Sequence, residues 1–163
     1  MIKKITVIAI TILVAIQFIR LEKNNSDDQS YHVSKKYPIS TELESILKSA
    51  CYDCHSNKTE YPAYAHFQPI GFFLDWHVRG GKKHLNFSEF TKKRIAIQNH
   101  KFEEIIELVE NKKMPLASYT YFGLHKDAKL SDDQRRLIVN WARSSMDSIK
   151  TYYPADSLVL KRK

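Results

Sequence analysis

Two cysteines and a histidine stand together in the sequence as Cys51-Tyr52-Asp53-Cys54-His55, and these are the only cysteines of the chain. The pattern C-x-x-C-H is the attachment signature of a c-type haem. On a helical turn, positions i and i+3 lie on one face, so the thiols of Cys51 and Cys54 can both reach the vinyl groups of one porphyrin. His55 then presents an imidazole nitrogen to the iron. The sequence therefore predicts one covalently bound haem c, with His55 as an axial ligand.

Two other kinds of site use a C-x-x-C pair. A redox dithiol of the thioredoxin type follows a strand in a βαβ unit, and no such pattern surrounds Cys51 and Cys54. A structural zinc site needs four ligands, and the sequence has neither a second C-x-x-C nor an H-x₃-H cluster. A dithiol or zinc module stays open as an alternative to haem.

The sixth position of the iron needs a ligand as well, and Met114-Pro115 is the leading candidate. The methionine follows the predicted end of a helix, and Pro115 fixes its own φ and stiffens the loop that would hold the sulfur. The competing explanation is a core methionine that fills a gap. His77, His84 and His125 are rival ligands, and two histidine ligands would give a lower potential than histidine with methionine.

The haem propionates need polar partners, and His77 and Arg79 are the first candidates for that role. The glycine pair at positions 80 and 81 would let the backbone approach the edge of the macrocycle. Three further histidines are not expected to bind iron. They are His32, His66 and His100.

Residues 61–76 are rich in aromatic side chains, which are expected to form a low-dielectric wall around the haem. Proline carbonyls commonly orient the proximal imidazole, so Pro62 or Pro69 is expected to accept a hydrogen bond from His55. The aromatic residues of this stretch are Tyr61, Tyr64, Phe67, Phe72, Phe73 and Trp76.

Helical periods account for most of the remaining sequence, and no stretch alternates as a strand does. A capping box at Thr41 and Glu44 begins a helix that ends at the cysteine motif. Further helices are predicted from Ser88 to about residue 98, over 102–111, and from a capping box at Ser131. The fold class is therefore all-α. The apolar positions that define the core faces are Leu43, Ile46, Leu47, Ala50, Phe102, Ile105, Ile106, Val109, Leu137, Ile138, Trp141 and Ala142.

The N-terminus has the pattern of a targeting segment. A mostly apolar run from Ile5 to Ile19 follows two lysines and ends at Arg20, as in a secretory signal. No small-residue A-x-A site follows the run, so residues 1–21 are expected to remain as a membrane-anchor helix with the rest of the chain outside. As a helix, this run spans roughly 22 Å against a bilayer core of about 30 Å, and snorkelling flanking side chains extend its reach. A cleaved signal peptide stays open.

The rest of the chain divides by composition. Residues 22–36 are polar and predict a flexible tether, residues 37–153 form the haem domain, and residues 154–163 form a tail that is either packed or frayed. Covalent haem is attached outside the cytoplasmic membrane, which predicts a periplasmic or other extracytoplasmic domain. Use of both cysteines by haem also agrees with an exported chain that has none left for disulfides.

Beyond the motif itself, a longer set of residues resembles a known family. The chain is similar to the haem-binding domain family of small bacterial envelope proteins, which carry one C-x-x-C-H and a downstream Met-Pro. Its helix order also resembles that of class I c-type cytochromes, in which the first and last helices pack to close the haem crevice. The resemblance covers residues 37–145 and implies haem binding without a defined reaction. The residues that carry it are Cys51, Cys54, His55, Ser56, Tyr61, Pro62, Tyr64, Pro69, His77, Gly80, Leu85, Asn86, Phe87, Ser88, Met114, Pro115, Tyr119, His125, Leu130, Ser131 and Trp141.

These features favour a membrane-tethered electron carrier over an enzyme. The sequence has no Ser-His-Asp pattern, no Gly-rich phosphate loop and no paired acid motif. The net charge of +8 is dispersed, and a basic face would steer the domain to acidic redox partner proteins or anionic headgroups rather than to nucleic acid. The alternative function is a haem sensor or peroxidase, in which the sixth position is labile and a distal histidine acts as acid or base.

Overall fold

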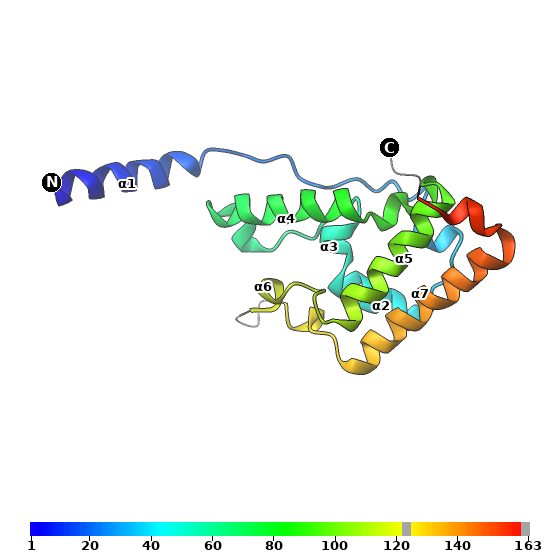
Figure 1. The fold of residues 1–163 in the computed structure, drawn as a ribbon. Helices are drawn as coiled ribbons and strands as arrows, with labels where there is room; N and C mark the ends of the chain where they lie inside the picture. Colours follow the sequence, from blue (N-terminus) through cyan, green and yellow to red (C-terminus); the bar gives the residue numbers. More distant parts are fainter. Residues whose placement is uncertain (122–124, 161–163) are drawn as a thin grey trace.

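The computed structural model of the chain describes residues 1–121 and 125–160, and within these residues there is no β-strand. The prediction of an all-α fold is confirmed (Figure 1). An isolated β-bridge joins Asn25 to Lys58. The helices and 3₁₀-helices (η) are α1 (Ile2–Ile16), η1 (Val33–Lys35), α2 (Thr41–Ala50), α3 (Tyr52–His55), η2 (Ala63–His66), α4 (Ile70–His84), η3 (Phe87–Lys92), α5 (Ile95–Glu110), α6 (Ala117–Thr120), η5 (Lys126–Ala128), α7 (Asp132–Tyr152) and η6 (Ala155–Leu158).

The hydrophobic core lies where α2, α5 and α7 meet. Trp141 of α7 packs edge-on against Phe102 of α5, with 5.3 Å between ring centroids, and its Nε1 donates to the Pro38 carbonyl at 3.1 Å. Most predicted core positions are buried, and Ile106 and Leu137 are partly buried at the edge of the core. Helical periodicity therefore identified the core faces correctly.

The caps of the first and last core helices differ in how well they were predicted. The box at Ser131 is confirmed, because its hydroxyl accepts from the Gln134 N–H and the Gln134 side chain accepts from the Ser131 N–H. At α2 the cap is Ser40 rather than Thr41. Ser40 has extended backbone, and its Oγ accepts from the Leu43 N–H at 3.2 Å, so Thr41 becomes the first helical residue.

Two stretches in the middle of the chain differ from the prediction. Ser88 does not begin an α-helix; it lies buried in η3, and α5 starts only at Ile95. Helix α4 was not predicted, because the adjacent glycines at 80 and 81 lower helix propensity. Tertiary contacts made by Gly81, described below, outweigh this local cost.

The N-terminal helix α1 extends away from the rest of the molecule with its apolar side chains exposed (Figure 1). It ends at Ile16, and the side chain of its cap Gln17 binds the domain, donating to the Gln68 carbonyl at 2.9 Å and accepting from the Gln68 N–H at 3.0 Å. Across the described residues, no helix is both long and apolar enough to cross a membrane. The expected membrane-spanning anchor over residues 1–21 is therefore not supported.

The segment expected to be a free polar tether lies against the domain instead. We call residues 22–32 the N-terminal strap; it runs beside α4 before reaching η1 (Figure 1). Val33, which follows it, is fully buried, and the Tyr31 carbonyl accepts from the Thr91 N–H at 3.0 Å. Composition missed this packing because the strap is held through polar groups. At the other end, η6 packs Leu158 on the core, and the last three residues of the predicted tail lie outside the described part.

Candidate haem site

The cysteine motif forms a single helical turn at the end of α2. Cys51 caps α3, and its carbonyl accepts from the N–H groups of Cys54 at 3.2 Å and His55 at 2.9 Å. This closed turn places the two cysteines three positions apart on one face. Both are free thiols and partly exposed. The local geometry expected from the motif is present.

Both thiols are protonated at neutral pH in this fold. Burial raises the pKa of Cys51 to about 12, with a further contribution from Cys54. Burial likewise raises the pKa of Cys54 to about 11, and the Asp53 carboxylate adds to the shift. The thiolate is the nucleophilic and metal-binding form of cysteine, and this environment disfavours it. A reactive dithiol would need the opposite shift.

The His55 imidazole is oriented by backbone carbonyls at the end of α4. Its Nδ1 lies 3.0 Å from the Gly81 oxygen and 3.1 Å from the Leu85 oxygen. Carbonyl oxygens only accept, so Nδ1 carries the proton and Nε2 keeps its lone pair. Burial also lowers the pKa of His55, against the effect of the two carbonyls, which favours the neutral ring. His55 is thus prepared to bind a metal through Nε2.

The expected source of this orientation was wrong. Neither Pro62 nor Pro69 supplies the carbonyl. The carbonyls come instead from the C-terminal end of α4 and its cap: the Gly81 carbonyl accepts from the Leu85 N–H at 2.9 Å as well as from His55, and the second carbonyl belongs to Leu85, which caps the helix.

Gly81 has a second role, because α4 approaches α3 there more closely than any side chain permits. A Cβ built on Gly81 would lie 2.5 Å from the Cys54 carbonyl oxygen and 3.0 Å from the Cys54 Cβ. A Cβ on the neighbouring Gly80 would meet nothing within 4 Å. Of the predicted glycine pair, Gly81 therefore serves the contact between α4 and the cysteine turn.

The loop that carries Met114 is held through its backbone. The Met114 N–H donates to the Leu108 carbonyl at 3.1 Å, and its carbonyl accepts from Arg135 Nη1 at 2.7 Å. Arg135 also donates to the Val109 carbonyl at 3.0 Å, so α7 fixes the end of α5 and the start of the loop together. Met114 itself is partly buried, and its role as iron ligand remains a prediction.

Aromatic and acidic side chains tie the next part of this loop to the cysteine turn. Tyr119 donates to Asp53 Oδ2 at 2.7 Å, and Asp53 lies between the two cysteines. The His125 ring stacks on Tyr119, with 4.0 Å between centroids, and its Nε2 lies 2.5 Å from the Tyr64 hydroxyl. Burial and the nearby Asp53 carboxylate raise the pKa of both tyrosines. The segment after Met114 thus contacts both α3 and η2.

His77 and Arg79 were predicted to bind the haem propionates, but neither lies on the side of α4 that faces α3. His77 Nδ1 pairs with the Phe73 carbonyl at 2.8 Å, and its ring contacts Phe73 and Trp76. Arg79 forms an ion pair with Asp75 at 2.8 Å. The structure does not bring either of them to His55, and their role in haem binding remains a prediction.

The other histidines have separate surroundings. His84 is exposed at the end of α4, and its charge contributes to the lowered pKa of His55. His32 caps η1 and packs edge-on against Tyr52. His100 pairs with two glutamates on α5, and His66 is exposed in η2.

The aromatic stretch is less buried than expected. Phe67, Phe73 and Trp76 are 64%, 55% and 69% exposed, whereas the other three aromatic residues of the stretch are partly buried. Helix α4 therefore carries two faces: one with Val78 and Gly81 packs on the domain, and the other leaves apolar surface uncovered.

Comparison with protein families identifies a match over most of the chain. The family model of the haem-binding domain matches residues 11–144, which is most of the chain. The chain belongs to the haem-binding domain family. No curated protein and no solved structure shows a significant match. The match to the haem-binding domain starts well before residue 37 and includes the N-terminal strap, consistent with the packing of the strap in the structure.

The residues present fit the cofactor that the family binds. Two free thiols share one turn, and an imidazole beside them has its Nδ1 proton engaged and its Nε2 lone pair available. A structural zinc site, by contrast, would need further ligands beside the two cysteines. Within residues 1–121 and 125–160, no three histidine, cysteine or acidic side chains come together in a way that could hold a metal ion.

Sequence reasoning missed two contributions to this site. The carbonyls of Gly81 and Leu85 carry no side-chain signal, although the glycine at 81 was a clue to a close approach of the backbone. Asn24 stands in a polar segment that looked like a tether, yet every one of its hydrogen-bonding atoms is used. Nothing in the local sequence distinguishes it from Asn25.

Proposed function

We propose that the chain is a c-type cytochrome domain that holds one haem covalently and transfers single electrons. Cys51 and Cys54 would hold the haem through thioether bonds, and His55 would bind the iron through Nε2. The observation that carries this proposal is the pair of carbonyls, from Gly81 of α4 and from its cap Leu85, at His55 Nδ1, which fixes the tautomer needed for ligation in a C-x-x-C-H turn. A bound haem would supply the reversible one-electron chemistry.

Met114 is the proposed sixth ligand, which makes the site a carrier rather than a catalyst. Its backbone is fixed by Arg135 and Leu108, and the following Tyr119 is bonded to Asp53 in the cysteine turn. These contacts support a position of the Met114 loop close to the cysteine turn. Two protein ligands that stay bound in both oxidation states allow rapid electron transfer and leave no open position for a substrate.

A sensor or peroxidase is the second candidate, and the Tyr64–His125 pair is the observation that favours it. A histidine whose Nε2 is 2.5 Å from a tyrosine hydroxyl is equipped to move a proton. In that case the position opposite His55 would be open or labile, and Met114 would be a packing residue. Fast binding of carbon monoxide by the wild-type protein would distinguish this candidate from the carrier.

Covalent attachment is tested first. Protein produced with an active cytochrome c maturation system is expected to keep its colour through acid-acetone extraction and denaturing electrophoresis. Cys54→Ala should retain at most one thioether, and His55→Ala should lose the native low-spin spectrum. A colourless product that carries zinc, made in the same host, would overturn the haem proposal in favour of a zinc or dithiol module.

The proposal also includes an extracytoplasmic location, association with the membrane through the N-terminal segment, and redox partners in the cell envelope. It is supported by the chemistry of haem attachment, the two lysines before the apolar run and the exposed apolar surface of α1. Mass spectrometry of protein from fractionated cells tests it. Recovery from the membrane or periplasmic fraction would support it; recovery from the cytoplasm would contradict it. The mass shows whether residues 1–20 are retained.

A further inference from the structure

All hydrogen-bonding atoms of Asn24, in the N-terminal strap, bind either α4 or the segment that follows the cysteine turn. Its side-chain Nδ2 donates to the Ser56 carbonyl and to Thr59 Oγ1, both at 2.9 Å. Its Oδ1 accepts from Lys82 Nζ at 2.5 Å. Its backbone N–H donates to the Tyr61 hydroxyl at 2.9 Å, and its backbone carbonyl accepts from the Thr59 N–H at 3.0 Å.

Two of these partners are next in sequence to His55 itself and to Gly81, which orients its ring. Ser56 follows His55 and ends α3, and Lys82 follows Gly81, whose carbonyl holds His55 Nδ1. Asn24 therefore bridges the two elements between which the imidazole is held. A movement of α4 away from the turn would have to break the bond to Lys82 or the bond to Ser56.

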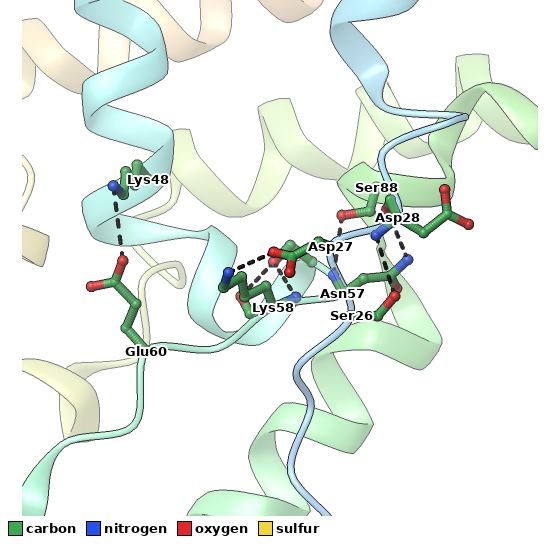
Figure 2. Close-up of polar contacts among 9 residues, drawn as sticks. Ser26, Asp27, Asp28, Lys48, Asn57, Lys58, Glu60 and Ser88 are labelled. Carbon is green, nitrogen blue, oxygen red and sulfur yellow. Dashed lines mark hydrogen bonds and ion pairs between the residues drawn. The ribbon is translucent and has the colours of Figure 1, made fainter.

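Other residues of the strap also contact the segment that follows the cysteine turn (Figure 2). The Ser26 N–H donates to the Asn57 carbonyl at 2.9 Å, and the Asn57 N–H donates to Ser88 Oγ at 3.1 Å. Ser56, Asn57 and Ser88 are 5%, 6% and 1% exposed, so these bonds are largely shielded from water. By contrast, the Asp27–Lys58 ion pair of the strap is exposed.

We infer that Asn24 is a positioning residue for the proximal ligand, acting on His55 through Ser56 and Lys82. This inference rests on the proposed role of His55 as iron ligand. Groups that surround a ligating imidazole fix its orientation and so tune the electronic structure and potential of the metal. The strap is then part of the haem site, although it lies far from the cysteine motif in sequence.

The test uses the ferric holoprotein and two measurements that report the ligand rather than stability. These are the paramagnetically shifted proton resonances of the haem methyl groups, which depend on the plane of the axial imidazole, and the midpoint potential. Asn24→Ala is expected to change the order or spread of the methyl resonances and to shift the potential. Lys82→Met, which removes one arm of the bridge, should move both in the same direction by less.

Asp27→Asn is the matched control, because it removes an exposed contact of the same strap and should leave both measurements unchanged. If Asn24→Ala and Lys82→Met lower only the unfolding temperature and leave the resonances and potential as in the wild type, Asn24 has a purely structural role and the inference is overturned. If Asn24→Ala does not fold, Lys82→Met alone decides by the same criterion.

Failure of the inference can be told apart from failure of the proposed function. Retention of the native low-spin spectrum by His55→Ala would show that His55 is not the ligand, whatever the Asn24 variants do. Loss of that spectrum in His55→Ala, together with unchanged haem methyl resonances and midpoint potential in Asn24→Ala and Lys82→Met, would overturn the positioning role alone.

Discussion

The two sides of the site are held in different ways. On the proximal side, the His55 ring is fixed directly, by two carbonyls at its Nδ1 and by the close contact of Gly81 with the cysteine turn. On the distal side, the backbone of Met114 is held by Arg135 and Leu108, and the loop beyond it reaches the turn through the hydroxyl of Tyr119.

This difference separates the tasks of the two proposed ligands. The His55 imidazole is oriented by the protein fold itself, since the C-terminal end of α4 meets the cysteine turn there and Asn24 of the N-terminal strap joins Ser56 to Lys82. The described part of the distal loop is joined to the cysteine turn through the Tyr119 side chain. We therefore expect changes on the proximal side to affect folding and ligation together, and changes on the distal side to affect ligation with little cost in stability.

The largest expected effect is that of Gly81→Ala. The new Cβ would overlap the Cys54 carbonyl oxygen, so α4 must move away from the turn and from His55. We expect the free energy of unfolding to fall by about 1–3 kcal/mol and the low-spin fraction to fall with it. Denaturant unfolding and absorption spectra measure the two effects.

Gly80→Ala is the control for that change. Position 80 is open, so the alanine should stabilise the helix by about 0.5–1 kcal/mol and leave the spectrum unchanged. Equal responses of the two variants would show that the close approach at Gly81 does not matter for the site.

Met114→Ala should have the largest effect on the distal side. If the thioether binds the iron, its removal should erase the weak far-red charge-transfer band of the ferric protein, lower the potential and allow carbon monoxide to bind readily. Because Met114 is only partly buried, the stability of the apoprotein should change by less than about 1 kcal/mol. Met114→His should restore a six-coordinate centre at a lower potential.

Met146→Ala is the matched control, since Met146 lies on α7 against the core. It should lower stability and leave the band in place. If the wild type already binds carbon monoxide fast and Met114→Ala changes nothing, Met114 is a packing residue and the sensor or peroxidase becomes the better proposal.

The apoprotein should also be sensitive to alkaline pH through the two thiols of the cysteine turn. Their pKa values in the fold, about 12 for Cys51 and about 11 for Cys54, lie above the ordinary value of 9.0. The folded state therefore holds more protons than the unfolded state above pH 9, and its stability falls as pH rises towards 11 to 12. Below pH 9 this contribution is fully present.

Unfolding of the apoprotein by denaturant between pH 8 and pH 11 measures this loss. The double variant Cys51→Ala/Cys54→Ala should lose less stability over that range, although tyrosines with raised pKa values still contribute in both proteins. Holoprotein with two thioethers should resemble the double variant. An equal decline in all three proteins would show that the thiols do not titrate in this way.

The sequence predicted what depends on local pattern and missed what depends on backbone and polar contacts. Periodicity found the core faces of α2, α5 and α7, and the cysteine motif found its turn. Helix α4 was missed because glycine propensity opposes it locally, while only the tertiary contact with Cys54 explains Gly81. The carbonyls at His55 and the bonds of Asn24 have no signature in composition, because any residue type has a carbonyl and most asparagines are exposed.

The smallest effect on the iron site is expected from Tyr119→Phe, which tests the link between the two sides. This variant loses the hydrogen bond to Asp53 and keeps the aromatic surface that stacks on His125. We expect a loss of about 1 kcal/mol in unfolding free energy, because one partly buried bond to a carboxylate is removed. The loop after Met114 should then leave the haem turn more often, so carbon monoxide should bind faster than in the wild type, with the far-red band weakened but present. Tyr152→Phe, at the exposed end of α7, should change neither property. A normal rate of carbon monoxide binding in Tyr119→Phe would show that the Met114 loop is held by Arg135 and α5 alone, and the distal side would then be as firmly fixed as the proximal one.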